Sequence, residues 1–197
     1  MSEQALFPVF LKLHGRKVLL VGGGAVACAK LPDLVRAGAL VTVVAPHTLP
    51  AVTLFGGVIV VHREFVASDL DGVWFVVAAA TPEVNRQVGA AAEERHVFVN
   101  AVDDADRASA YTGGVLHRGG VTIAVSTEGR APALAGLLRE GLEALVPDDI
   151  EAWVGAAREI RQQQRAAGVP MADRRPMLLR SLNRLYEAKT TAVEAHE

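Results

Sequence analysis

The stretch "KVLLVGGGAVACAK", residues 17–30, decides the fold. A short apolar run, 17–21, stops at three consecutive glycines, which is typical of a buried strand that ends in a tight turn. The small and apolar residues that follow, 25–39, have helical spacing, and the helix is expected to close near Gly38. A strand, a glycine turn and a helix in this order predict the first unit of an α/β fold.

The glycine turn matches the pattern G-x-G-x-x-A through Gly22, Gly24 and Ala27. In dinucleotide-binding turns the first glycine permits the tight turn, the second lets a pyrophosphate approach the backbone, and the third small residue lets helix and strand pack closely. The amides of the helix amino terminus then face the phosphates. Pro32 interrupts the pattern, because a proline inside a helix removes one hydrogen bond and favours a kink.

The alternation of strands and helices continues and predicts a Rossmann-like parallel sheet with crossover helices. The expected strands are 40–46, 57–65, 72–80 and 97–102, and a helix is expected at 82–96. After residue 103 the chain becomes glycine-rich, with two short strands expected around "HRGG", 117–120. An amphipathic helix is expected at 132–145, followed by two helical segments at roughly 149–167 and 173–189.

Composition limits the function classes. The chain has 197 residues, of which 51% are apolar, and a formal net charge of −2, so binding to a nucleic-acid backbone is not favoured. No apolar run approaches the roughly 18 residues that a membrane helix needs, and the start "MSEQALFPVF" does not have the pattern of a signal peptide. The single cysteine, Cys28, excludes an internal disulfide and a thiolate-rich metal site. A cytoplasmic protein is the expectation.

The second strand ends without the acidic residue that usually binds the ribose hydroxyls of NAD. Pro46 and His47 stand there instead. The residues alone therefore do not choose between NAD and NADP. His47 either contacts the adenosine side of the cofactor or is an ordinary histidine of an exposed loop.

Three further stretches are in register with the glycine turn: "AAATPEVNRQV" (78–88), "VFVNAVDDADRASA" (97–110) and "VTIAVSTEGRAPALAGLLREGLEALVP" (121–147). Together with the opening "LFPVFLKLHGRKVLLVGGGAVACAK", they resemble the amino-terminal module of siroheme synthase, the precorrin-2 dehydrogenase family. The resemblance covers about residues 5–147. Some members of that family also act as sirohydrochlorin ferrochelatase.

The resemblance implies an NAD-binding Rossmann domain (1–113), a small dimerisation region (114–147) and a helical carboxyl-terminal region (148–197), in a homodimer. The reaction would be oxidation of precorrin-2 to sirohydrochlorin, with a hydride passed to NAD. Asp103 would be the catalytic residue, with Asp104 beside it, and a carboxylate at the end of a parallel strand is placed to accept a proton. The implied cofactor-binding residues are Gly22, Gly23, Gly24, Ala25, Val26, Pro46 and His47.

A tetrapyrrole that carries many carboxylates needs cations and free amides in its site. The candidates are Ser126, Thr127, Arg130 and His117, with Arg107 and Arg118 as further cations; each is otherwise an ordinary surface residue. This sequence departs from the family pattern at residues 110–115. It also has Glu128 where the family often has a glycine and Ala131 where the family often has a serine. These departures bear on the substrate and on metal insertion more than on the cofactor.

The sequence also allows other functions, one enzymatic and two without catalysis. The same site could also insert iron into sirohydrochlorin; no clustered His, Cys or Glu ligands suggest a resident metal, so the expected metal site is none. A nucleotide-sensing module without catalysis, or a homologue that has lost substrate binding, are the other readings. The leucines of helix 132–145 share one face, which requires either an intrachain core or a two-fold dimer interface.

Overall fold

A computed structural model of the protein describes residues 6–102, 104 and 107–194. The chain divides into two compact units, one of residues 1–112 with 128–130 and one of residues 113–127 with 131–197.

The first unit is built on a five-stranded sheet in the order β3-β2-β1-β4-β5, in which every neighbouring pair is parallel. Its strands are β1 (Lys17–Val21), β2 (Leu40–Val44), β3 (Val58–Val61), β4 (Phe75–Ala78) and β5 (Phe98–Ala101). Because β1 pairs with both β2 and β4, the strand order reverses at β1, and this is the point where sheets of this kind bind ligands. The predicted Rossmann-like parallel sheet is confirmed.

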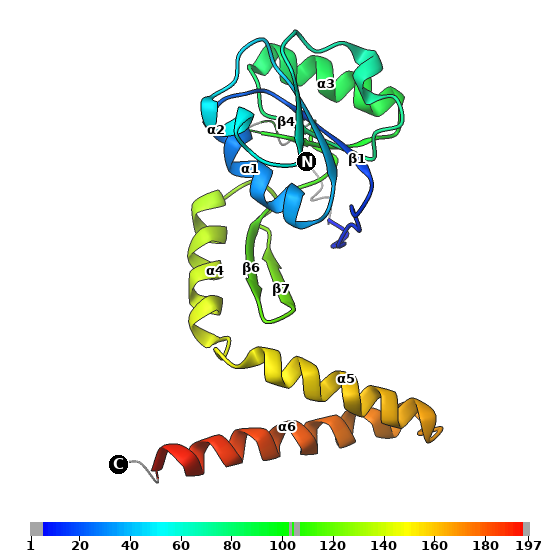
Figure 1. Ribbon diagram of the computed structural model, residues 1–197, viewed down its shortest axis with the longest axis vertical. Coiled ribbons are helices and arrows are strands. Elements are labelled where there is room, and N and C mark those ends of the chain that lie inside the picture. Colours follow the sequence, from blue (N-terminus) through cyan, green and yellow to red (C-terminus); the bar gives the residue numbers. More distant parts are fainter. Residues whose placement is uncertain (1–5, 103, 105–106, 195–197) are drawn as a thin grey trace. The chain divides into compact units, whose positions relative to one another are not determined.

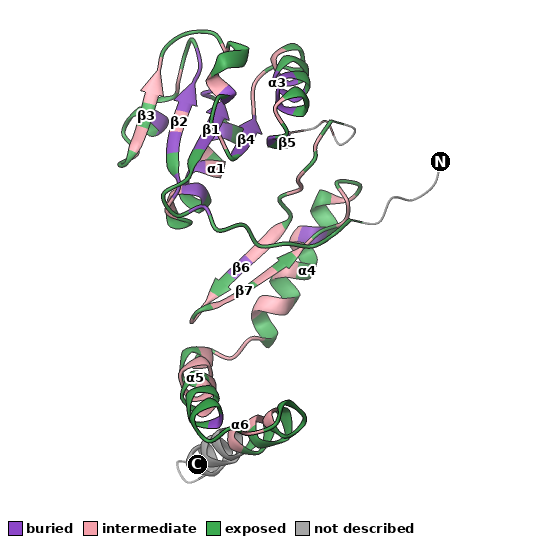
Figure 2. Ribbon diagram, turned by 90° about the vertical axis from the view of Figure 1, so that its right-hand side faces the viewer, coloured by how far each residue is buried: buried purple, intermediate pink, exposed green. Residues whose placement is uncertain are grey.

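Helices cover both faces of this sheet (Figure 1). They are α1 (Ala25–Arg36), α2 (Pro50–Thr53), the 3₁₀ helix η1 (Ala67–Leu70) and α3 (Pro82–Glu94). One core cluster joins α1 and α2 to alternate sheet residues such as Leu20 and Val43, and a second joins α3 and η1 to the other alternates, such as Leu19 and Val76. The buried residues therefore concentrate in the strands of the sheet (Figure 2), as expected for a parallel sheet.

Helix α1 continues through Pro32, which lies exposed inside it. The predicted closure near Gly38 is confirmed: Gly38 has φ +73°, and the amides of Gly38 and Ala39 donate to the carbonyls of Val35 and Leu34. This is the usual way in which a glycine ends a helix and satisfies its last carbonyls.

The second unit begins with an antiparallel hairpin, β6 (Gly114–Arg118) and β7 (Val121–Val125), as predicted around "HRGG". Gly119 and Gly120 both have positive φ, which is what a two-residue hairpin turn of the favoured hand requires. The hairpin packs on α4 (Pro132–Leu145) through small residues: a Cβ at Gly114 would lie 2.8 Å from the carbonyl oxygen of Ala135.

Three leucines of α4 remain largely exposed. Leu134, Leu137 and Leu145 have 48%, 64% and 78% of their surface exposed, whereas Ala135, which meets β6, is 4% exposed. These three leucines are therefore not part of an intrachain core. Figure 2 shows α4 mostly exposed or half-buried.

Two long helices complete the second unit, α5 (Ile150–Ala166) and α6 (Met171–Glu194). The buried side chain of Gln164 donates to the Arg174 carbonyl over 3.1 Å, and Arg174 Nε donates to the Val169 carbonyl over 2.9 Å, so the turn between the helices is pinned from both sides. Among the described residues, no helix combines the length and the hydropathy that crossing a bilayer demands.

The connection from β3 to β4 is held by an ion pair. Arg63 donates from Nη1 to Asp69 Oδ2 over 2.8 Å, and the same carboxylate oxygen accepts the Val66 amide over 3.0 Å. The hydrogen bond from Arg63 is the main cause that lowers the pKa of Asp69 below its usual 3.8. The carboxylate therefore joins the end of β3 to the first turn of η1.

This pairing predicts a pH-dependent contribution to stability. A carboxyl whose pKa is lower in the folded than in the unfolded state stabilises the fold above its unfolded pKa, and this stabilisation is lost as the pH falls through the folded pKa. We expect Asp69→Asn to lower the free energy of unfolding most at neutral pH, with the deficit shrinking as the pH falls below the ordinary aspartate pKa of 3.8 and through the lower pKa of the folded state. Urea titrations at a series of pH values measure it. Asp33→Asn, which removes an exposed ion pair with Arg36, is the control, and an Asp69→Asn deficit that is equal at every pH contradicts the assignment.

Candidate functional site

The glycine turn lies where the ends of β1, β2 and β4 converge. Gly22 has φ +121°, and a Cβ built on it would stand 2.2 Å from the carbonyl oxygen of Ala79. Its amide donates to the Val44 carbonyl over 3.0 Å. Both the backbone conformation and the lack of space exclude any other residue type here, so this glycine is required by the fold itself.

Gly23 brings the loop after β2 against the turn. A Cβ on Gly23 would lie 2.2 Å from the carbonyl oxygen of His47, and the Leu49 amide donates to the Gly23 carbonyl over 2.8 Å. The structure thus places Pro46 and His47 beside the glycine turn, as the sequence predicted for a cofactor site. The sequence alone does not explain why residue 23 is a glycine, because the loop that contacts it lies more than twenty residues further along the chain.

Gly24 differs from its two neighbours, because a Cβ on it would meet nothing within 4 Å. It is the N-cap of α1, and no side chain caps the helix there; the first intrahelical bond runs from the Cys28 amide to the Gly24 carbonyl over 3.0 Å. Ala25 and Val26 are exposed, and Ala27 is fully buried against the sheet. An open helix amino terminus with exposed small residues fits the pyrophosphate of a dinucleotide.

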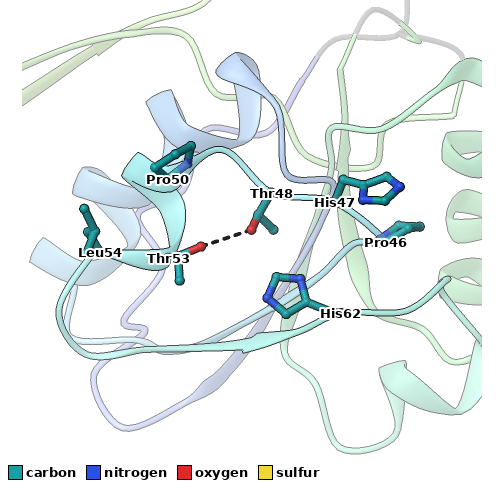
Figure 3. Close-up of a pocket in the computed structure, with 7 residues that line it drawn as sticks. All are labelled: Pro46, His47, Thr48, Pro50, Thr53, Leu54 and His62. Carbon is teal, nitrogen blue, oxygen red and sulfur yellow. Dashed lines mark hydrogen bonds between the residues drawn. The ribbon is translucent and has the colours of Figure 1, made fainter.

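A pocket of about 500 Å³ adjoins the same edge of the sheet (Figure 3). Its lining residues are Pro46, His47, Thr48, Pro50, Thr53, Leu54 and His62. The hydroxyl oxygens of Thr48 and Thr53 are 3.1 Å apart and hydrogen-bonded. The pocket lies past the end of β2, where the adenosine ribose of a dinucleotide binds in folds of this type. His62 was missed by sequence reasoning, since only the pairing of β3 with β2 brings it here.

The end of β5 is fixed by a buried amide. Asn85 Oδ1 accepts the Ala80 amide over 3.0 Å, and its Nδ2 donates to the Val102 carbonyl over 3.4 Å, so this side chain joins the ends of β4 and β5. The residue after Val102 is the predicted catalytic Asp103, which lies outside the described residues. Asp104 forms an ion pair with Arg107 at 3.4 Å.

A chain of polar side chains connects α1 to β5. Lys30 Nζ donates to Thr112 Oγ1 over 2.7 Å, and that hydroxyl donates to Oδ1 of the buried Asn100 over 3.3 Å. Asn100 Nδ2 in turn donates to the Ala110 carbonyl over 3.0 Å. Burial of Lys30 lowers its pKa, with nearby Asp33 acting in the opposite direction. These hydrogen bonds hold residues 110–112 against β5, the strand that precedes Asp103. Residues 110–112 belong to one of the segments that depart from the family pattern.

The predicted substrate residues lie around the hairpin and the start of α4. His117 is exposed on β6, with Nδ1 3.1 Å from Thr122 Oγ1 on β7. Thr127 Oγ1 accepts the Ala131 amide over 3.2 Å just before α4. The N-cap residue of α4, Ala131, makes no side-chain capping bond, and the amino terminus of a helix attracts anions.

Two of the remaining cations have structural contacts. Arg118 donates from Nη1 to the carbonyls of Glu143 and Val146 at 3.2 and 2.5 Å, so it binds the carboxyl end of α4. Arg130 lies 3.5 Å from the carboxylate of Glu128, which has φ +56°, a conformation that glycine adopts more easily. Among the residues described, no group of three His, Cys, Asp or Glu side chains is arranged to hold a metal ion.

The fold and the open helix terminus define a nucleotide-binding protein, and comparison with known families agrees. Residues 9–114 match the family described as "Putative NAD(P)-binding", and the chain belongs to it. Residues 118–145 match the family described as "Sirohaem biosynthesis protein central". The resemblance to the siroheme synthase module that the sequence motifs indicated is thereby confirmed.

Curated relatives of the chain are named siroheme synthase. The chain is 40% identical over 172 residues to siroheme synthase 3 of Aeromonas hydrophila, which covers 85% of this chain and 37% of that protein. It is 44% identical over 148 residues to siroheme synthase of Neisseria meningitidis serogroup B, covering 73% of this chain and 31% of that protein. The chain therefore spans about a third of the length of the curated relatives that it matches.

A solved structure matches almost from end to end. The chain is similar to "SirC, precorrin-2 dehydrogenase", with a TM-score of 0.70 and 25% sequence identity, over 89% of this chain and 88% of that one. That protein has nearly the same extent as this chain, unlike the longer curated relatives.

Substitution of Gly22 and of Gly24 should have opposite effects on the stability of the fold. Gly24→Asp has space, and aspartate is a favoured N-cap, so we expect the melting temperature to be unchanged or higher. The same carboxylate repels a pyrophosphate, and we expect NAD binding to be lost. Gly22→Ala forces a Cβ into the Ala79 carbonyl, so we expect it to destabilise the fold by at least about 2 kcal/mol. Calorimetric melting and NAD titration of both variants measure this, and NAD binding retained by Gly24→Asp would show that the pyrophosphate binds elsewhere.

Proposed function

We propose that the protein catalyses the NAD-dependent oxidation of precorrin-2 to sirohydrochlorin. The observation that carries the proposal is the open amino terminus of α1, which lies where the strand order of the sheet reverses. Its N-cap residue, Gly24, is exposed and provides no side chain to cap the helix. The family matches and the similarity to a precorrin-2 dehydrogenase support it. The proposal keeps the cytoplasmic location expected from the composition.

The cofactor would be held by the residues that the sequence predicted. The amides after Gly24 would bind the pyrophosphate, and Pro46 and His47 would contact the adenosine side. Bound NAD supplies the acceptor for the hydride. Removal of a hydride from the substrate leaves one proton to be lost, and Asp103, the second residue after β5, would accept that proton as a carboxylate. The buried amide of Asn85 would position Asp103 through its bond to the Val102 carbonyl.

The carboxylates of the tetrapyrrole would bind at the start of α4 and on the hairpin. The first amides of α4 attract an anion, and a guanidinium such as Arg130 binds a carboxylate with two hydrogen bonds. Ser126, Thr127 and His117 would add hydroxyl and imidazole contacts. Arg118 is the least suited of the sequence-derived cations, because it already binds the last carbonyls of α4.

The second unit would also form a homodimer through the leucine face of α4. Leu134, Leu137 and Leu145 are exposed on this helix, and a two-fold interface would bury the same apolar face of both copies. Residues 114–147 would then be the dimerisation region between an NAD-binding domain, 1–113, and a helical region, 148–197.

Insertion of iron into the product remains an alternative second activity, with the metal as substrate. The curated relatives are named siroheme synthases, and this is the observation that favours it. It is tested in the same cuvette as the oxidation, by adding ferrous or cobaltous ion after NADH has formed.

Asp103→Asn tests the proton acceptor. We expect this variant to bind NAD like the wild type and to lose about 10²–10⁴-fold in turnover, because an amide cannot take the proton. NADH absorbance with anaerobically prepared precorrin-2 measures turnover. Asp104→Asn, which removes only the ion pair with Arg107, is the matched control, and unchanged turnover of Asp103→Asn would remove Asp103 from the mechanism.

Leu137→Glu tests the dimer. Leu137 is 64% exposed, so a glutamate is tolerated by the monomer but is buried in a two-fold interface at high cost. We expect the wild type to sediment as a dimer and this variant as a monomer. Ile59→Glu, at 65% exposure on β3, is the control and should remain dimeric. A wild type that sediments as a monomer at all concentrations contradicts the interface.

A further inference from the structure

Lys30 joins the helix of the proposed cofactor site to the segment that follows β5. It lies in the second turn of α1, whose open amino terminus is the proposed site of the pyrophosphate. Its Nζ donates to Thr112 Oγ1 over 2.7 Å, although the two residues are 82 positions apart in the sequence. The role of this contact rests on the proposed function, because it concerns how the surroundings of Asp103 are held during the oxidation.

The segment after β5 is bonded back to the same strand. The amides of Ser109 and Ala110 both donate to the Val99 carbonyl over 3.0 Å, and Ser109 Oγ accepts the Val99 amide over 2.9 Å. Asn100, which is 7% exposed, donates from Nδ2 to the Ala110 carbonyl over 3.0 Å. The chain therefore returns at Ser109 to the strand that it left, and the proposed proton acceptor lies between these two points in the sequence.

The hydroxyl of Thr112 ends this attachment, and Lys30 fixes its orientation. Thr112 Oγ1 accepts from Lys30 and donates its own hydrogen to Asn100 Oδ1 over 3.3 Å. Because an ammonium can only donate, the hydrogen of the hydroxyl is directed to the amide oxygen. The Nδ2 of Asn100 then faces the Ala110 carbonyl. The ammonium thus sets the direction of every hydrogen bond from Lys30 to Ala110.

Two further features support this role of Lys30. The nearby carboxylate of Asp33 is paired with Arg36 at 3.4 Å, which leaves the Lys30 ammonium to Thr112. Ala110 packs against the core cluster to which α1 contributes. Apolar contact brings the segment and the helix together without a preferred direction, whereas a hydrogen bond has one. The position of residues 109–112 along α1 therefore depends on the bond from Lys30.

We propose that Lys30 is a positioning residue for the oxidation of precorrin-2. Through Thr112 and Asn100 it holds residues 109–112 on β5, and it thereby sets the place of the segment that contains Asp103 relative to α1, the helix that binds the cofactor. Lys30 acts through Thr112 and not on the substrate itself. A misplacement of about 1 Å can cost on the order of 100-fold in rate, so the loss of this one bond is enough to slow the reaction.

Lys30→Met keeps most of the side chain and removes the donor. We expect kcat with precorrin-2 to fall about 10- to 100-fold, while NAD binds as it does to the wild type, because the amino terminus of α1 is unchanged. Lys30→Arg restores a donor and should recover part of the lost turnover. Arg36→Met is the matched control, because it removes an exposed cation of the same helix that pairs only with Asp33, and it should leave kcat unchanged.

A double-mutant cycle with Thr112→Val tests the route by which Lys30 acts. Thr112→Val removes the hydroxyl and keeps the shape of the side chain. We expect each single variant to lower kcat by a similar factor and the double variant to lower it no further, because both remove the same hydrogen bond. Losses that multiply in the double variant overturn the proposal, since Lys30 then acts by a route that does not include Thr112.

Amide hydrogen exchange tests the positioning without a tetrapyrrole. In Lys30→Met we expect the amides of Ser109 and Ala110 to exchange at least about tenfold faster than in the wild type, while the amides of β1 stay protected and show that the protein is folded. Unchanged exchange at Ser109 and Ala110, or unchanged kcat, overturns the proposal. A wild type that binds no NAD, or that forms no NADH from precorrin-2, overturns the proposed function instead, so the two failures are distinguishable.

Discussion

The structure depends on the approach of three backbone segments at the glycine turn. The carbonyl of Ala79 stands where a side chain on Gly22 would be, and the carbonyl of His47 stands where one on Gly23 would be. These contacts bring the ends of β1, β2 and β4 together at the one edge of the sheet where α1 begins. Gly24 has no such contact, which leaves the helix terminus open. Gly22 and Gly23 therefore build the turn, whereas Gly24 is the residue at which we propose that a ligand approaches.

Buried amide side chains extend that constraint to β5. Asn85 joins the end of β4 to the end of β5, and Asn100 joins β5 to residues 110–112, which Lys30 reaches from α1. A buried polar group costs free energy unless its hydrogen bonds are made. Satisfied as they are here, these groups specify one position for the strand that leads to Asp103. The chemistry proposed for Asp103 therefore rests on side chains of α1, α3 and β5.

The second unit solves a different problem. Its hairpin and α4 approach each other closely at Gly114 and Ala135, while Leu134, Leu137 and Leu145 of α4 stay exposed. The amino end of the same helix is uncapped. One helix thus offers an apolar face, proposed for a second copy of the chain, and a polar end, proposed for the carboxylates of a tetrapyrrole.

The sequence by itself determined the elements, because each depends on neighbours along the chain: the strands from apolar runs, α1 from the glycine turn, the β6–β7 turn from two glycines. It also determined the family, through motifs such as "NAVDD" and "STEGRAP". Only the tertiary structure decided why Gly23 is a glycine, that Asn85 and Lys30 support β5, and that His62 lines the same pocket as His47. These contacts link residues from about 15 to more than 80 positions apart, and no local pattern encodes them. The exposure of Leu134, Leu137 and Leu145 on α4 was likewise visible only in the tertiary structure.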